Sequence, residues 1–220
     1  MLAASRPAAA GTKIMHLAEE TRKETVIEKS RFIACAVRIA SEAQAREYIA
    51  RIRREYPDAT HVCTAWQLSA PVEAQRSSDD REPAGTAGRP MLEALLASSV
   101  TDACVCVVRY FGGIKLGAGG LIRAYAGAVT GCLAAAAKLR DVTFLSWRLE
   151  YPYSLSGRLE TWLRTHTVEP QFHYGEQVAC EFLTETDITQ TILDLTRGEA
   201  GPVLLGQAVR EVPADGTEYK

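Results

Sequence analysis

The spacing of apolar and polar residues predicts alternating strands and helices from about residue 13 to residue 142. Apolar segments at 26–27 and 32–37 are typical of strands. Ser41, with Gln44 three residues later, forms a capping box and predicts the start of a helix that closes at Pro57. The buried stripe of this helix is predicted to consist of Ala45, Tyr48, Ile49 and Ile52.

A strand is predicted from Thr60 to Leu68, because its side chains alternate between two faces. One face carries His61, Cys63 and Ala65, and the other carries Val62, Thr64 and Trp66. The continuous apolar run 104–108 predicts a strand buried on both faces, which delivers Arg109 and Tyr110 to its end. Helices are predicted at 91–98, with Pro90 near the start, and at about 119–139.

After Thr143 the pattern changes to a second, compact series of elements. It predicts strands at 147–155, 167–173, 177–184 and 203–212, and helices from Ser156 and at 187–197. The resulting order, β-α-β-β-α-β, is that of a ferredoxin-like domain. The expected fold class is therefore α/β (α+β) with two domains, at 13–142 and 143–220, behind a flexible tail at 1–12.

Composition restricts the expected class and cellular location of the protein. A chain of 220 residues with 47% hydrophobic content can bury a sizeable core. The formal net charge of −2 gives no global attraction to nucleic acid, so any such contact needs a local basic patch. The six cysteines show no C-x-x-C spacing, and we find neither a signal-peptide core nor a membrane span. We therefore expect a cytoplasmic protein without membrane contact.

Two loops flank the 104–108 strand and carry most of the candidate chemistry. The first, Ser78 to Pro90, is crowded with acids, Gly and Pro; its candidate site residues are Asp79, Asp80, Glu82, Gly85, Thr86 and Gly88. The second, Phe111 to Gly120, matches neither a Walker loop nor a dinucleotide fingerprint. Two interpretations of its Gly112, Gly113, Gly117, Gly119 and Gly120 stay open: an anion site beside Lys115 at a helix start, or glycines that permit positive φ and close packing.

Both loops also carry a family resemblance. The pattern Asp79-Asp80-x-Glu82-Pro83-x-Gly85-Thr86-Ala87-Gly88-x-Pro90 and the later Val108–Leu121 segment resemble the YigZ/IMPACT family, as do Lys29-Ser30-Arg31-Phe32 and His61-x-Cys63-x-Ala65-Trp66. The resemblance implies an N-terminal α/β sandwich similar to a ribosomal-protein fold and an elongation factor G domain, before the ferredoxin-like domain. Arg81 departs from the family pattern, which usually has Gly there, so either this position does not need positive φ or the turn is altered.

Two further clusters have competing interpretations. His61 and Cys63 are neighbours on one strand face, so they form either a nucleophile pair or a buried Cys beside a polar His; the latter is favoured because no orienting residue is identifiable. The outer face of the 41–56 helix is basic, and it either contacts phosphates or, more commonly, is a solvated surface. Its cations are Arg46, Arg51, Arg53 and Arg54.

The favoured function is that of a non-catalytic, translation-associated regulator. The resemblance implies it, because eukaryotic IMPACT acts on the control of an initiation-factor kinase through a protein partner. RNA, the ribosome, a translation-regulating protein or a small anion would bind a charged cleft, and no cofactor is expected. We expect this cleft to contain the candidate residues of both loops with His61, Arg109 and Tyr110, and Asp80 or Glu82 to approach Arg109. The alternative is an enzyme acting on a small phosphorylated or anionic substrate, with Mg²⁺ held by the acids.

Overall fold

The computed structural model describes residues 15–69 and 73–215. The chain divides into two compact units, one ending at Arg140 and the other beginning at Asp141. The boundary expected between 142 and 143 falls inside the same strand as this division. The expected flexible tail, 1–12, lies outside the described residues. Within the described ranges, no helix is long and apolar enough to cross a membrane.

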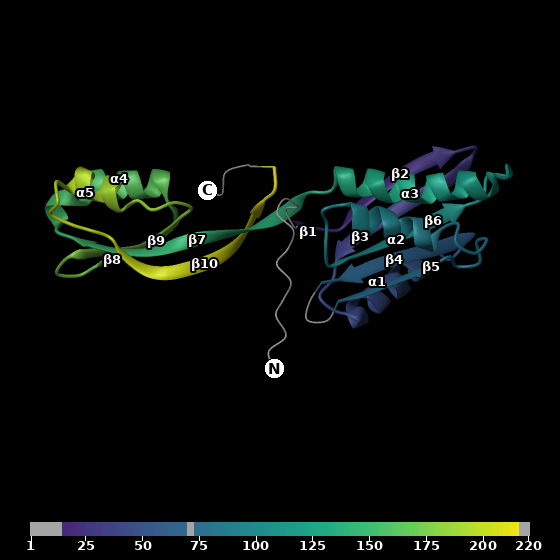
Figure 1. Cartoon of the computed structure of the whole chain (residues 1–220), viewed down its shortest axis with the longest axis horizontal. Helices are drawn as coiled ribbons and strands as arrows, with labels where there is room; N and C mark the ends of the chain where they lie inside the picture. Colours follow the sequence, from purple (N-terminus) through teal and green to yellow (C-terminus); the bar gives the residue numbers. More distant parts are fainter. Residues whose placement is uncertain (1–14, 70–72, 216–220) are drawn as a thin grey trace. The chain divides into compact units, whose positions relative to one another are not determined.

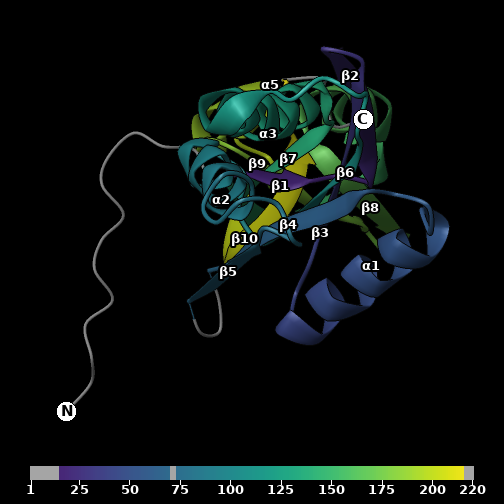
Figure 2. The same cartoon turned by 90° about the vertical axis from the view of Figure 1, so that its right-hand side faces the viewer.

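The first unit is built on an antiparallel five-stranded sheet with the order β2-β3-β6-β4-β5. Figure 2 shows α1 on one side of this sheet and α2 and α3 on the other. The strands are β2 (Thr21–Ile27), β3 (Ser30–Arg38), β4 (His61–Leu68), β5 (Ala74–Ser78) and β6 (Ala103–Tyr110). The helices are α1 (Glu42–Glu55), α2 (Gly88–Ala97) and α3 (Gly117–Ala135). A short strand, β1 (Met15–Leu17), pairs with Lys138–Arg140.

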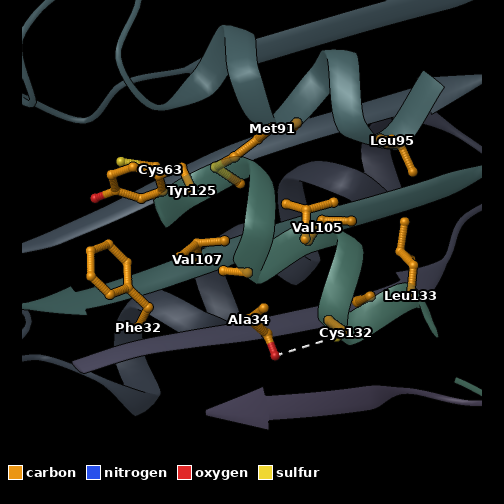
Figure 3. Close-up of a cluster of buried hydrophobic side chains, with 14 of the residues drawn as sticks. Phe32, Ala34, Cys63, Met91, Leu95, Val105, Val107, Tyr125, Cys132 and Leu133 are labelled. Carbon is orange, nitrogen blue, oxygen red and sulfur yellow. Dashed lines mark hydrogen bonds between the residues drawn. The ribbon is translucent and has the colours of Figure 1, made fainter. Parts of the chain in front are cut away.

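The central strand β6 explains why this sheet has two cores. All of its residues except Tyr110 are buried, as the continuous apolar run predicted. Cys63 and Ala65 face the cluster under α2 and α3, which Figure 3 shows around Tyr125, and Val62 and Trp66 face the cluster under α1. The alternation predicted for the 60–68 strand is therefore confirmed.

Local signals placed most elements correctly, and the exceptions have physical reasons. The cap of α1 is confirmed, since the Gln44 N–H donates to Ser41 Oγ at 3.2 Å. The basic face of α1 is largely paired with acids: Arg46 with Glu42, Arg51 with Glu20, and Arg53 with Asp80. Strand β5 was missed because it is a short edge strand of polar residues. Helix α3 ends at Ala135 and not near 139, because Lys138–Arg140 pair with β1.

The second unit has the predicted β-α-β-β-α-β order, so the predicted fold class is confirmed. Its sheet has the order β8-β9-β7-β10, and α4 and α5 lie on the same side of it (Figure 1). The elements are β7 (Lys138–Tyr151), α4 (Ser156–His166), β8 (Val168–Tyr174), β9 (Val178–Thr184), α5 (Thr189–Thr196) and β10 (Val203–Pro213), with a 3₁₀ turn at Tyr153–Leu155. Leu159 and Leu163 of α4 and Ile192 of α5 pack on Leu149 and Tyr151 of β7.

Candidate functional site

The two loops meet at one end of the first sheet, where β6 ends and β4 begins. His61 and Arg109 are directly paired across these strands. We call Asp79–Ala87, between β5 and α2, the acidic loop, and Phe111–Gly120, which runs into the first turn of α3, the glycine-rich segment. Paired residues of neighbouring strands point to the same face, so the side chains of His61 and Arg109 both lie on the α2/α3 side.

Arg109 is buried, and it joins the acidic loop to the rest of the unit. Its Nη1 donates to Glu82 Oε1 at 2.6 Å, and its side chain and that of Glu82 are only 5% and 3% exposed. Tyr125 of α3 donates to the same carboxylate oxygen at 2.7 Å. The expected contact between Arg109 and an acid is therefore confirmed with Glu82, whereas Asp80 binds elsewhere.

The Arg109 guanidinium also contacts Ser30 and two aromatic rings. Nη2 donates to Ser30 Oγ at 3.3 Å, and the guanidinium lies over the rings of Phe32 and Phe111, with its carbon 5.3 and 5.6 Å from their centroids. Nε is buried without a hydrogen-bond partner among the described residues. Because this cation is enclosed and paired, its charge is directed at Glu82 and not at the surface of the protein.

The glycine-rich segment is held against the β2–β3 turn by Gly112. Its N–H donates to Ser30 Oγ at 3.2 Å, and a Cβ built on Gly112 would lie 2.1 Å from the carbonyl carbon of Lys29. No side chain fits there. Gly113 and Gly117 adopt φ values of +86° and +72°. At these positions the glycines serve backbone geometry, as one of the two interpretations proposed. Gly119 and Gly120 lie in the first turn of α3.

Asp79 caps the start of α2. Its carboxylate accepts the N–H groups of Gly85, Ala87 and Gly88 at 2.9, 3.0 and 2.8 Å. Burial favours a higher pKa for Asp79, but these three donors together lower the pKa from its ordinary value. Thr86 Oγ1 donates to the Pro83 carbonyl at 2.7 Å and fixes the turn within the loop. Asp79, Gly85, Thr86 and Gly88 thus form a local capping structure.

Asp80 is bound to the beginning of β4. Its Oδ2 accepts the Val62 N–H at 2.7 Å, and its Oδ1 accepts Arg53 at 3.2 Å. Its backbone carbonyl lies 2.8 Å from His61 Nδ1. A carbonyl can only accept, so His61 carries a proton on Nδ1, and its Nε2 lies 3.7 Å from Glu82 Oε1.

Cys63 does not have the properties of a nucleophile. Its side chain is buried, its Sγ donates to the Asp79 carbonyl at 3.0 Å, and burial raises the pKa of the thiol to about 12. The thiol is therefore protonated at neutral pH. This geometry matches the interpretation of Cys63 as a buried residue beside a polar His.

The acids of the acidic loop do not form a ligand set for a metal ion. Asp79 faces the start of α2, Asp80 faces β4, and Glu82 is turned inward to Arg109. None of them belongs to a group of three converging ligand atoms among the described residues. The arrangement gives no support to Mg²⁺ binding by these three carboxylates.

Most of the glycine-rich segment faces solvent. Lys115 is exposed, and the first turn of α3 has neither a side-chain cap nor an acidic residue. Phe111, Ile114 and Ile122 are 47%, 39% and 41% exposed. Tyr110, expected in the same cleft, packs instead with the cluster on the α1 side, and the Arg31 guanidinium lies over its ring. The exposed candidate residues are Gly113, Lys115, Gly117 and Gly119 in this segment and Gly85 in the acidic loop.

Sequence reasoning missed two polar groups of this site. The sequence motifs give no role to Ser30, and they give none to Tyr125, which lies in the helix predicted at about 119–139. Both bind the Arg109–Glu82 pair, across 79 and 43 residues of sequence respectively. A buried tyrosine needs a partner for its hydroxyl group, and this was the available signal.

Fold and site together define a class: a two-unit α+β protein whose first unit carries a buried Arg–Glu pair beneath a glycine-rich segment, and whose second unit is ferredoxin-like. The Impact N-terminal domain matches residues 28–133, which include both loops. IMPACT family member YvyE of Bacillus subtilis is 38% identical over 187 residues, covering 83% of this chain and 86% of the relative. The chain belongs to the IMPACT family.

Other comparisons agree with this assignment. IMPACT family member YigZ of Escherichia coli is 43% identical over 129 residues, covering 58% of this chain and 63% of the relative. A crystal structure described as that of a hypothetical protein matches with a TM-score of 0.56 and 31% identity, over 88% of this chain and 97% of that chain. This similarity extends over both units and supports the fold.

Arg109→Ala should lower the free energy of unfolding by about 3–5 kcal/mol, because it leaves the Glu82 carboxylate buried without its cation. Arg53→Ala, which removes an exposed partner of Asp80, should cost less than about 1 kcal/mol. Urea denaturation of the two variants measures the difference. Equal, small losses for both would contradict a structural role of the buried pair.

Asp79→Asn should lower stability by about 1 kcal/mol at neutral pH, because the amide retains an acceptor but loses the charge at the helix start. The folded pKa of Asp79 lies below the unfolded value, so its contribution is complete above about pH 4 and is lost as the pH falls through the folded pKa. The stability gap between wild type and variant should therefore close in acid, as measured by denaturation at several pH values. A stability difference between wild type and variant that grows as the pH falls would contradict the predicted direction of the pKa shift.

Arg81→Gly should raise stability by about 0.5–1 kcal/mol. Arg81 stands where the family usually has Gly, and it adopts a φ of +71°, so the turn keeps the left-handed backbone at a cost that Gly avoids. The same substitution at a position with helical backbone, Arg89→Gly in α2, should lower stability by about 1 kcal/mol, because glycine is a poor helix former. Thermal or urea unfolding that ranks the two variants in the opposite order would disprove the strain at position 81.

Proposed function

We propose that the protein is a non-catalytic, translation-associated regulator whose glycine-rich segment binds RNA, the ribosome or a translation-regulating protein. Membership of the IMPACT family supports the association with translation. The observation that carries the binding role is the division of charges in the first unit. Arg109, Glu82, Asp79 and Asp80 are used in internal contacts, whereas Lys115 and the open start of α3 face solvent.

The charge pattern of this surface favours an anionic ligand. The sequence contains no Asp or Glu between Asp102 and Asp141, whereas Lys115 and Arg123 lie in that interval. A Cβ built on Gly119 would lie 3.5 Å from Arg123 Nη1, so this guanidinium is beside the first turn of α3. Unoccupied N–H groups at a helix start add a partial positive charge to the two cations. A small anion, a phosphate or a carboxylate of a partner satisfies all three.

The contact surface is also pre-organised. Gly112 fits tightly against Lys29, and Ser30 binds both Gly112 and Arg109. These contacts fix the beginning of the glycine-rich segment without occupying its exposed side. A pre-ordered surface binds with a smaller entropic cost than a loop that must order on binding.

A second candidate function, an enzyme acting on a small phosphorylated or anionic substrate, has one observation in its favour. The His61 ring is oriented by the hydrogen bond between its Nδ1 and the Asp80 carbonyl, and a general base needs such a positioned imidazole. It lacks a nucleophile, because Cys63 is a buried thiol with a pKa of about 12. The binding role accounts for more of the geometry.

Lys115→Glu should weaken association with ribosomes or RNA in co-sedimentation, because it reverses the exposed cation at the start of α3. The loss should shrink as salt rises, since screening weakens the wild-type contact. Arg46→Glu is the matched control: it reverses an exposed cation on α1, on the other side of the sheet, and should leave association unchanged.

Cys63→Ser should also leave association intact. Equal effects of Lys115→Glu and Arg46→Glu would point to non-specific charge attraction and contradict the assignment of this surface. Multiple turnover of a phosphorylated substrate that is abolished by His61→Ala would replace the proposal with the enzyme.

A further inference from the structure

Strand β10, at the edge of the second sheet, differs from every other sheet edge among residues 15–69 and 73–215. It spans 11 residues and pairs with β7 on one side, and its other side has no strand partner in the described part of the chain. Its segment from Val203 to Val209 contains no charged residue and no proline. Val203, Leu204, Leu205 and Val209 are 60%, 53%, 53% and 58% exposed.

The other edge strands are protected against pairing, and β1 is only three residues long. Strand β8, at the opposite edge of the same sheet, contains Pro170 and a register shift between Val168 and Gln171. Strand β2 carries consecutive charged residues, and β5 has only five, mostly polar, residues. Proteins use such bulges, prolines, charges and short strands to prevent edge-to-edge association. Strand β10 is long, and its residues 203–209 contain neither a charge nor a proline, so this edge lacks three of these four protections.

The two faces of β10 have different surroundings. Ala208 and Val212 pack in a small cluster with Val142 and Phe144 on one face of the sheet. Side chains alternate along a strand, so Val203, Leu205 and Val209 share the other face, and there they are exposed. An uncharged apolar stripe beside unpaired backbone groups can pair with another β-strand. It offers no cation to the phosphates of a nucleic acid.

We propose that β10 pairs with β10 of a second copy of this chain, antiparallel and about a two-fold axis at Gly206. In this register Val203 of each copy lies opposite Val209 of the other, and Leu204 lies opposite Ala208. No charged residue is opposed within the segment, and Gly206 allows close approach at the axis. Self-pairing would hydrogen-bond the unpaired backbone N–H and C=O groups of both edge strands. A two-fold dimer is also the commonest symmetric assembly. The pairing is independent of the function proposed for the glycine-rich segment.

Sedimentation equilibrium of the full chain tests the pairing, from about 1 μM to about 1 mM, the range of transient association. Wild type should form a reversible dimer, and Val209→Lys should remove it, because an exposed edge lysine prevents pairing. Val26→Lys is the matched control, since Val26 lies on edge strand β2 and is 60% exposed. A monomer at all concentrations would overturn the proposal, as would a dimer that survives Val209→Lys or open-ended aggregation.

The register has its own measurement. The double variant Val203→Cys, Val209→Cys should form intermolecular disulfides with oxidised glutathione, because opposed residues bring their Cα atoms within disulfide range. Val203→Cys alone should not, since equivalent residues of the two copies lie at opposite ends of the paired segment. The native cysteines are all buried, which keeps the background low. Efficient crosslinking of the single variant would refute a two-fold axis at Gly206.

Discussion

The buried contact between Arg109 and Glu82 determines the shape of the first unit around its loops. Removing two charges from water is costly, and the cost is offset only when the pair is close and the remaining polar atoms are bonded. Here Tyr125 donates to the shared carboxylate oxygen and Ser30 accepts from the guanidinium. The four residues come from the acidic loop, β6, α3 and β3, so the pair holds together segments that are far apart in the sequence.

The geometry also explains why the cation is an arginine. Its planar guanidinium donates in two directions, to Glu82 and to Ser30, and its faces contact the rings of Phe32 and Phe111. A lysine ammonium is a compact point charge and cannot reproduce two fixed donors together with ring stacking. Phe32 in turn meets Tyr125 edge to face, with centroids 5.3 Å apart, so aromatic packing and ion pairing stabilise one another.

Much of this architecture could be predicted from the sequence, because periodicity reports burial directly. The run 104–108, the cap at Ser41 and the β-α-β-β-α-β order each follow from local patterns that the tertiary structure reinforces. Strand β5 could not be predicted, since an edge strand of polar residues has no apolar alternation. The C-terminal end of α3 could not be predicted either. Lys138–Arg140, which follow the helix, pair with β1, and this long-range contact is not visible in the local sequence.

The contacts of the individual site residues were harder to predict than the fold. The sequence drew attention to the acids of the acidic loop, but it did not show what each carboxylate contacts. That choice depends on the backbone, where consecutive positive φ values at Asp80 and Arg81 precede Glu82, whose carboxylate is turned inward while that of Asp79 remains at the helix start. A loop rich in acids and glycines is typical of a catalytic site, yet here the same residues build a rigid support. The surface proposed for binding is the part of the glycine-rich segment that this support leaves exposed.

The glycine-rich segment and the edge strand β10 would contribute to partner binding in different ways. The glycine-rich segment offers one exposed lysine and one helix start in each copy, which is a small surface for a large anionic partner. Pairing through β10 would give the assembly two such surfaces without adding a contact to either. The second binding event would then be intramolecular, and the gain in affinity would be governed by effective concentration and by whether one partner can reach both surfaces. Weak contacts at each segment are therefore compatible with tight association of a dimer to an extended partner.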